Sequence, residues 1–308
     1  MAAILGIALP FFAIIFAGYG VMHWRRLDRG VVAGLNTFVF YVSLPALLLG
    51  QLAQAPVERL LDWRFVLVFY GASVLVYGGF MAVSLLRGDG LGVAAMRSLT
   101  SIFGNWGYMG IPLLLQAYGS EGAVLAVLAV LLDNIVSVPV TVGLIEASRG
   151  GAGLAGVGRT LKSVGRNPLV LATLGGVSVA VSGVTLPLPV AGFLDLLGSA
   201  AAPCALFALG GTLVDAPKGD ARGEVAIVSL ARLVLHPALV AVGAFWLVAM
   251  PTDLAQAAVM VAALPTGATC FVIGQRYGVY ALRASTMVLA THLFGVLTLT
   301  ALIAWFSS

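Results

Sequence analysis

The chain has 308 residues, of which 61% are hydrophobic and only 9% are charged, with a formal net charge of +4 and a mean hydropathy of +1.07. A water-soluble domain carries about 25% charged residues to cover its surface, so this composition excludes a soluble globular protein. The basic residues lie in short segments between apolar runs and form no single patch, which argues against nucleic acid as a partner and leaves lipid as the solvent.

Five apolar runs in the first part of the chain are near the roughly 20 residues that a spanning helix needs. They predict spans at residues 2–22, 31–50, 64–86, 96–117 and 121–146. The first run has no basic segment before it and no small-residue cleavage site after it. We therefore interpret it as a span and not as a signal peptide.

A glycine-rich, basic segment at 147–166 interrupts this pattern, and five more apolar runs follow it. They predict spans at residues 167–183, 190–213, 224–249, 254–275 and 281–305. The predicted fold is an all-α integral membrane protein of ten transmembrane helices. Its parts are a first five-helix unit at 1–146, a cytoplasmic connection at 147–166 and a second five-helix unit at 167–308.

The distribution of Lys and Arg predicts the orientation, because these residues accumulate in cytoplasmic loops. The segments after spans 1, 3, 5, 7 and 9 hold thirteen of the sixteen, and the other side holds only Arg59 and Arg64. The thirteen are Arg25, Arg26, Arg29, Arg87, Arg97, Arg149, Arg159, Lys162, Arg166, Lys218, Arg222, Arg276 and Arg283. Both termini are then expected outside, which is the periplasm for a bacterial inner membrane.

Two landmarks indicate an internal repeat. Pro45 in span 2 and Pro203 in span 7 are 158 residues apart, and the Tyr-Gly pairs that begin at Tyr118 and Tyr277 are 159 residues apart. Since each half holds an odd number of spans, the second half must insert upside down relative to the first. Inverted repeats are typical of secondary transporters, with the substrate site near the midplane between them.

Spans 4 and 9 contain residues that interrupt a helix. Residues 104–112 hold three glycines, an asparagine and Pro112, and residues 264–270 hold Pro265, Thr266, Gly267 and Thr269. Glycine favours an unwound backbone and proline removes a donor. Two broken helices at matched positions would cross and direct their N-termini at one point, which favours an anion. The alternative is that the glycines only permit close helix packing.

A carboxylate lies near the centre of span 5, at Asp133-Asn134. An ionisable residue at that depth is a functional candidate. The repeat offset carries these two positions to Thr291 and His292 in span 10. We interpret Asp133, Asn134 and His292 as a polar core, with cation ligation or proton exchange as the role of Asp133 and hydrogen bonding to the substrate as the role of Asn134. Coupling to Na⁺, coupling to H⁺ and uncoupled transport are all compatible with it. A structural hydrogen bond between helices is the alternative.

Three further features have simpler interpretations. Arg232, two turns into span 8, is expected to extend to the headgroups, with a counter-charge for an anionic substrate as the alternative. His236-Pro237 is expected to be a packing kink, and a proton relay is the alternative. Cys204 and Cys270 lie in apolar runs and are expected to pack as ordinary apolar residues, so we predict no metal site and no cofactor.

Motifs along essentially the whole chain are similar to those of the auxin efflux carrier family, which includes bacterial members assigned to malonate or malate transport. The motifs are Pro10-Phe11-Phe12, Gly18-Tyr19-Gly20, Leu35-Asn36, Leu44-Pro45-Ala46-Leu47-Leu48, Asn105-x-Gly107-Tyr108-x-Gly110-Ile111-Pro112-Leu113, Leu264-Pro265-Thr266-Gly267-Ala268 and Gln275-Arg276-Tyr277-Gly278. The fourth-span motif is the most specific of these. The family commonly has an asparagine shortly after the ninth-span proline, where this chain has Ala268 or Thr269.

The resemblance implies a crossover fold related to that of bile acid:sodium symporters. Spans 1, 2, 6 and 7 would form a scaffold that often mediates dimerisation, and spans 3–5 and 8–10 would form a core that moves against it. The long cytoplasmic loop of the plant carriers is absent.

Together these observations predict a secondary carrier of a small organic anion in the inner membrane, with an elevator-like or rocking exchange of access. The residues expected to bind the substrate are Asn105, Gly107, Tyr108, Pro112, Pro265, Thr266 and Thr269. A channel and a membrane sensor that binds an anion without flux are the alternatives. An enzyme is not expected, because the sequence has no His-x-x-x-His, no Gly-x-Ser-x-Gly and no paired carboxylates at helical spacing.

Overall fold

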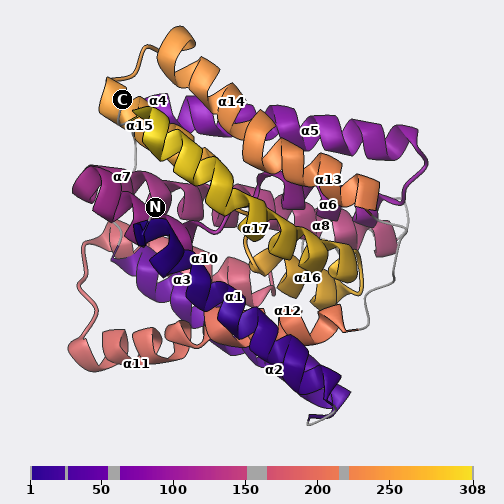
Figure 1. Cartoon of the computed structure of the whole chain (residues 1–308). Coiled ribbons are helices and arrows are strands. Elements are labelled where there is room, and N and C mark those ends of the chain that lie inside the picture. Colours follow the sequence, from indigo (N-terminus) through magenta and orange to yellow (C-terminus); the bar gives the residue numbers. More distant parts are fainter. Residues whose placement is uncertain (1, 25–26, 55–62, 151–164, 215–221, 307–308) are drawn as a thin grey trace.

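The structure is a computed structural model, and it describes residues 2–24, 27–54, 63–150, 165–214 and 222–306. All regular elements within these ranges are helices, and one isolated β-bridge accompanies them. The all-α prediction is therefore confirmed. Figure 1 shows the helices as a bundle in which the start of the first helix and the end of the last lie at the same end.

The helices before the predicted connection follow the five predicted runs. They are α1 (Ala2–His23), α2 (Arg29–Phe38), the π-helical turn η1 (Val39–Ser43), α3 (Leu44–Ala53), α4 (Trp63–Phe65), η3 (Val66–Tyr70), α5 (Gly71–Leu86), α6 (Leu91–Ile102), η4 (Trp106–Gly110), α7 (Ile111–Leu132), η5 (Asp133–Ser137) and α8 (Val138–Gly150). Residue Gly119 bends α7 with φ 66°, which glycine adopts readily. This bend lies between the predicted fourth and fifth runs.

The helices after the connection follow the other five runs. They are α10 (Pro168–Ser182), α11 (Leu188–Ser199), α12 (Ala201–Leu213), α13 (Arg222–Leu230), η6 (Ala231–Leu235), α14 (His236–Ala241), η7 (Val242–Leu247), α15 (Thr252–Ala262), α16 (Thr269–Tyr277) and α17 (Ala281–Phe306).

Four of the π-helical turns end two residues before a proline. The turns η1, η4, η5 and η6 precede Pro45, Pro112, Pro139 and Pro237. A proline inside a helix cannot donate to the carbonyl four residues back and its ring crowds that carbonyl. The hydrogen-bond ladder therefore widens locally and the helix continues.

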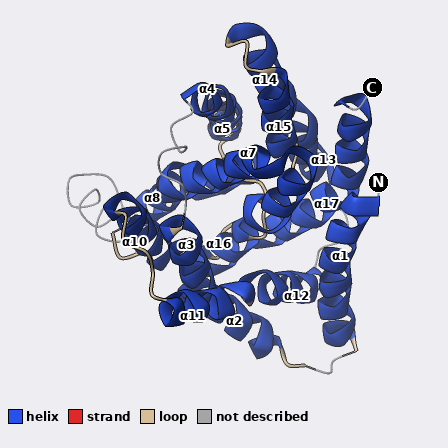
Figure 2. Ribbon diagram, turned by 90° about the vertical axis from the view of Figure 1, so that its left-hand side faces the viewer, coloured by secondary structure: helices blue, strands red, loops and turns tan. Residues whose placement is uncertain are grey.

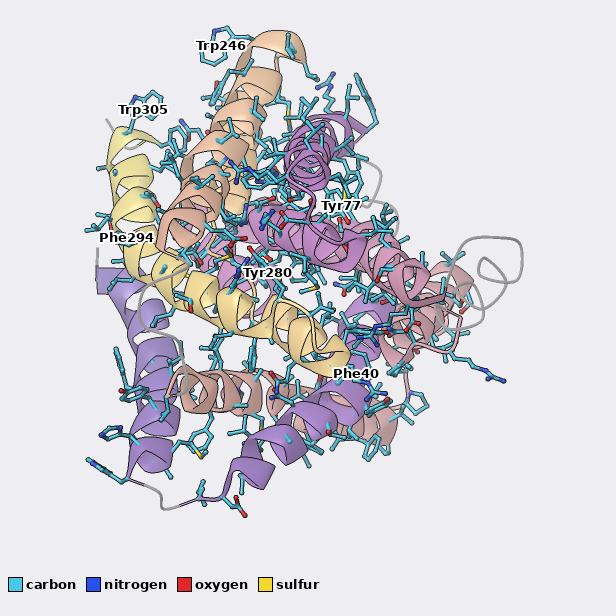
Figure 3. The ribbon with its side chains drawn as sticks, turned by 90° about the vertical axis from the view of Figure 1, so that its right-hand side faces the viewer. Phe40, Tyr77, Trp246, Tyr280, Phe294 and Trp305 are labelled. Carbon is cyan, nitrogen blue, oxygen red and sulfur yellow. The ribbon has the colours of Figure 1, made fainter. Side chains whose placement is uncertain are left out.

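Six helices in the described residues are long and apolar enough to cross a membrane. They are Gly30–Ala53, Trp63–Leu86, Glu121–Arg149, Leu188–Gly211, Gly223–Leu247 and Ala281–Phe306. Four shorter apolar helices accompany them: Ala13–His23, Leu91–Ile102, Pro168–Ser182 and Thr252–Ala262. Large apolar side chains such as Phe294, Trp246 and Trp305 point away from the bundle and are 54%, 72% and 69% exposed (Figure 3). The chain is a multi-pass membrane protein.

The helices pack in two sets. In one set α1 lies against α12, and α3 lies against α10 and α11. In the other α5 contacts α6, α6 contacts α8, α15 contacts α7 and α14, and α16 contacts α17. Figure 2 shows α11, α2 and α12 at one side of the molecule and α4, α5, α14 and α15 at the other. One interruption lies between α6 and η4, which leads into α7, and the other lies between α15 and α16.

Arg97 corrects part of the sequence interpretation, which placed it in a cytoplasmic loop. It lies within α6 and is 7% exposed. Its guanidinium donates to Glu224 Oε1 (2.5 Å), to Ser84 Oγ (2.5 Å) and to Asp89. The Tyr280 hydroxyl also donates to Glu224 Oε1 (2.5 Å), and burial together with that carboxylate raises the pKa of the hydroxyl. This cluster joins α5, α6, α13 and the start of α17 at one end.

Candidate functional site

The two interrupted segments lie against each other and are hydrogen-bonded through their backbones. Gly104 and Thr266 form an antiparallel β-bridge. The backbone amide of Asn105 donates to Pro265 O (2.8 Å), and the backbone amide of Gly267 donates to Phe103 O (3.1 Å). Each segment thereby satisfies backbone groups that the other exposes, which an unwound backbone inside a membrane requires.

A helix begins directly after each interruption. The turn η4, which leads into α7, begins at Trp106, and α16 begins at Thr269. The first-turn amides of a helix have no partner within it and carry partial positive charge. Since the two helices start from opposite sides of one short bridge, both N-termini lie at the crossing.

A pocket opens at this crossing, with an empty volume of about 500 Å³ including its mouth. It is lined by Leu44, Leu47, Leu48, Gln51, Phe103, Gly104, Asn105, Trp106, Gly107, Val130, Asn134, Leu169, Gly267, Ala268 and Thr269. These residues come from both interruptions, from α7 and η5, and from α3 and α10. Among these lining residues no side chain is charged, and the polar ones are Gln51, Asn105, Asn134 and Thr269.

Asn105 is held in place by a histidine. Its side-chain nitrogen lies 3.1 Å from His292 Nε2, and His292 Nδ1 lies 2.8 Å from Val288 O. Because a carbonyl oxygen can only accept, Nδ1 carries the proton, and Nε2 accepts from the side-chain amide of Asn105. This leaves the Asn105 oxygen and its second amide hydrogen available at the pocket.

Thr266 lies behind the pocket and is fully buried. Its hydroxyl donates to Thr100 O (3.1 Å), and its amide donates to Thr291 Oγ1 (3.0 Å). The side chain of Thr266 therefore braces the crossing against α6, and its backbone amide braces it against α17.

Asp133 is fully buried beside the pocket and is hydrogen-bonded on both carboxylate oxygens. Trp106 Nε1 donates to Oδ2 (2.7 Å), and Ser137 Oγ donates to Oδ1 (2.7 Å). The Tyr70 hydroxyl lies 3.0 Å from Ser137 Oγ. Asp133 is thus linked to the crossing through the indole of Trp106.

Arg232 does not extend to the headgroups, and that expectation is wrong. Its side chain is fully buried, and its guanidinium lies over the Trp106 ring at 4.7 Å from the centroid. Nη1 donates to Ala262 O (2.8 Å) and lies 2.9 Å from His236 Nδ1. The carbonyl of Ala262 is free to accept because α15 ends there. An arginine that finds such partners inside the protein has no need of the membrane surface.

The structure brings together some of the predicted site residues and separates others. Asn105, Gly107, Asn134 and Thr269 line the pocket, whereas Pro265, Thr266, Asp133 and His292 lie behind it. The side chains of Tyr108 and Pro112 lie outside what the structure describes. Gln51 and Trp106 line the pocket but were not among the predicted site residues.

Among the described residues, no group of three or more His, Cys, Asp or Glu side chains is arranged to hold a metal ion. Cys270 is buried, Cys204 is partly buried, and both are free thiols.

Comparisons with known proteins agree with a membrane transporter. The family model described as "Membrane transport protein" matches residues 3–156 and 154–303. A protein of Rhizobium meliloti (strain 1021) named "Putative malonate transporter" is 37% identical over 308 residues, covering 98% of this chain and 96% of that protein. "Uncharacterized transporter YfdV" of Escherichia coli (strain K12) is 26% identical and covers 94% and 93%.

A multi-pass helical bundle with a pocket at two interrupted helices is thus matched by a transport-protein family along most of its length. The chain belongs to this family of membrane transport proteins, the auxin efflux carrier family. It is a transporter of a small molecule and not an enzyme.

Proposed function

We propose that the protein is a secondary carrier that moves a small carboxylate across the membrane by alternating access. The observation that carries this proposal is the crossing, where two helix N-termini meet at a pocket that contains Asn105 and has no charged lining side chain among its described residues. Such a site attracts a carboxylate through oriented amides. It holds the anion without the strong ion pair that would slow release.

Malonate is the first substrate to test. The relative from Rhizobium meliloti has malonate in its name and covers nearly the whole chain. Malonate is a small dicarboxylate, and the pocket lining offers the polar groups Gln51, Asn105, Asn134 and Thr269 to its two carboxylates. One carboxylate would lie at the helix N-termini and the other toward Gln51 of α3.

The architecture proposed for this carrier is two inverted five-helix repeats, at 1–146 and 167–308, joined by the connection at 147–166. Helices 4 and 9 of the ten are broken and cross, as in bile acid:sodium symporters. The contacts among α1, α3, α10, α11 and α12 support a scaffold of spans 1, 2, 6 and 7. The remaining helices, of spans 3–5 and 8–10, would form the moving core.

Alternating access by an elevator-like motion needs a site shared by the scaffold and the core. The pocket lining meets this requirement, because it includes Leu44, Leu47, Leu48 and Gln51 of α3 and Leu169 of α10, while the rest comes from the core. A shift of the core along α3 and α10 would carry the crossing from one side to the other. The scaffold would also mediate a homodimer.

For the orientation we propose a bacterial inner membrane with both termini in the periplasm. The positive-inside distribution of Lys and Arg supports it. The position of the start of α1 and the end of α17 at one end of the bundle is consistent with an even number of crossings (Figure 1).

For coupling, the polar core of Asp133, Asn134 and His292 remains the candidate, with Na⁺ or H⁺ as the ion. Asp133 is the one carboxylate beside the crossing among the described residues, and it contacts Trp106 of the pocket wall. A change in its protonation would reach the pocket through that hydrogen bond.

Uptake of labelled substrates into proteoliposomes tests the proposal. Malonate, malate, lactate and indole-3-acetate would be compared with and without Na⁺ and at several external pH values. We expect saturable malonate uptake that falls by at least about tenfold in Asn105→Ala, as the loss of a hydrogen bond to a charged group predicts.

The matched control is Asn36→Ala. Asn36 is also buried, lies in α2 away from the pocket, and its side chain makes no hydrogen bond in the described residues. Uptake in Asn36→Ala is expected to equal that of the wild type. Full uptake in Asn105→Ala contradicts the assignment of the site, and no uptake of any of these anions contradicts the substrate class.

A sensor and a channel are the competing functions. A sensor would bind malonate at the same pocket but would give no flux in this assay. A channel would give uptake that does not saturate and that follows the gradient alone.

A further inference from the structure

A fully buried arginine stands behind the pocket with part of its guanidinium unpartnered. Arg232 lies in η6 and uses Nη1 for Ala262 O and His236 Nδ1. Its Nε and Nη2 make no hydrogen bond with any described residue. Buried donors without partners are rare, because each loses its hydration without compensation. A structural role alone would not need these two donors to stay free.

The unpartnered nitrogen points at the crossing. A Cβ placed on Gly104 would collide with Arg232 Nη2 and with the ring of Trp106, so the guanidinium rests directly on the Gly104 backbone. Gly104 and Trp106 both line the pocket, and Arg232 does not. A single glycine and one indole therefore separate a full positive charge from the space where the substrate would bind.

The titratable groups next to Arg232 determine the net charge at this place. Asp133 is on the far edge of Trp106, bonded to Nε1. His236 accepts from Arg232 at Nδ1, and its Nε2 lies 3.0 Å from Ser73 Oγ. Since Ser73 Oγ donates to Phe69 O (2.9 Å), it accepts from His236, which is then neutral with its proton on Nε2. Arg232 and Asp133 are therefore the two full charges at this place in the described chain.

We propose that Arg232 is the fixed cation of the substrate site, which gives the uncharged pocket its preference for anions through the Gly104 backbone. This inference rests on the proposed function. The guanidinium holds the same position whether or not an anion is present, and it attracts the carboxylate without contacting it. A direct ion pair would hold the substrate more tightly and would slow its release. The arginine is thus a positioning and specificity-determining residue.

The size of the effect follows from electrostatics. A unit charge roughly 8 Å away at an effective dielectric constant of about 20 changes the affinity for a monoanion by about 30-fold. A second negative charge on the substrate, farther from Arg232, adds less. The preference for malonate over uncharged solutes would thus come from Arg232 together with the two helix N-termini.

The test is equilibrium binding of malonate to the full chain in detergent micelles, measured by titration calorimetry, for four variants and the wild type. Arg232→Gln removes the charge and keeps a donor of similar length. Arg232→Lys keeps the charge. Arg232→Gln combined with Asp133→Asn removes both buried charges and leaves the net charge of the site unchanged. Arg283→Gln is the control, since that side chain is 44% exposed and lies at one end of α17.

We expect the dissociation constant to rise about 30-fold in Arg232→Gln, to stay within about threefold of the wild type in Arg232→Lys, and to stay unchanged in Arg283→Gln. The double variant is expected to lie between the wild type and Arg232→Gln, because the removal of Asp133 also removes its repulsion. Thermal unfolding of each variant reports whether it is folded.

Three results would overturn the inference. The first is a folded Arg232→Gln protein that binds malonate as the wild type does. The second is a folded Arg232→Lys protein that binds as weakly as Arg232→Gln, since charge would then not be the cause. The third is unfolding of both Arg232→Gln and the double variant, which makes the arginine a structural residue. A wild-type protein that binds no carboxylate instead refutes the proposed function itself.

Discussion

The two faces of the crossing differ in charge although only one segment of backbone separates them. The pocket face presents Gln51, Asn105, Asn134 and Thr269, and among the described lining residues none is charged. The inner face holds Arg232 and Asp133, both fully buried and both in contact with Trp106. The molecule thus keeps its charges where the substrate cannot touch them. Under the proposed function, an anion is attracted by the field of the site and can still leave.

A side chain added between the two faces should disturb this separation of charges most strongly. In Gly104→Ala the new methyl group would collide with Arg232 and Trp106, and overpacking of this kind destabilises by about 3 kcal/mol. We expect a lower melting temperature in detergent and loss of malonate uptake.

Gly107→Ala is the matched variant on the pocket face. Its methyl group would meet Gln51 Oε1 at 3.6 Å, which is ordinary contact. This protein should have the melting temperature of the wild type and bind malonate only a few-fold more weakly. Equal melting temperatures for the two alanine variants would contradict the described packing of Arg232.

A second variant tests the link between the faces. Trp106→Phe keeps a ring under Arg232 but removes the donor to Asp133 Oδ2, and a lost hydrogen bond to a buried charge costs about 2 kcal/mol. We expect a lower melting temperature and a change in the pH dependence of malonate uptake, because the remaining bond from Ser137 is the only described one to that carboxylate.

The control for this change is Trp246→Phe. Trp246 is 72% exposed at the outer edge of the bundle (Figure 3), and its replacement should leave both the melting temperature and the uptake unchanged. If Trp106→Phe behaves in the same way, the indole does not couple Asp133 to the pocket.

The smallest expected effect concerns the two halves of the crossing, which carry Asn105 on one side and Thr269 on the other. In Thr269→Asn both helix N-termini would present an amide. Because Thr269 lines the pocket at the first residue of α16, an added donor should tighten malonate binding by less than about tenfold. Titration calorimetry measures this change, and weaker binding would show that the pocket has no room for the amide.

The sequence was sufficient for the features that depend on local chemistry. Glycine and proline in residues 104–112 and 264–270 predicted where the helices stop, and the structure has α6 ending at Ile102 and α15 at Ala262. The apolar runs predicted the helices because a membrane-spanning segment must satisfy its own backbone. Asn105 was predicted as a site residue because it lies in the interrupted segment with three glycines and Pro112 and belongs to the fourth-span motif.

The features that depend on tertiary pairing could not be predicted. Arg232 donates to Ala262 O, which is available because of an interruption thirty residues away. The space for its guanidinium exists because residue 104, in the interruption between α6 and η4, is a glycine. Gln51 was missed because the predicted second span ended at residue 50, whereas α3 continues to Ala53. Gln51 lies one residue beyond the predicted end of the span, so a boundary error of three residues left a pocket side chain outside it.

If the crossing binds a small carboxylate in a carrier, proteoliposomes should show counterflow of malonate. Proteoliposomes loaded with unlabelled malonate are diluted into a trace of labelled malonate, and the label inside is followed with time. We expect a transient accumulation of label above the outside concentration in the wild type and in Asn36→Ala, and none in Asn105→Ala. Equilibration without overshoot in the wild type, or an equal overshoot in Asn105→Ala, would contradict this expectation.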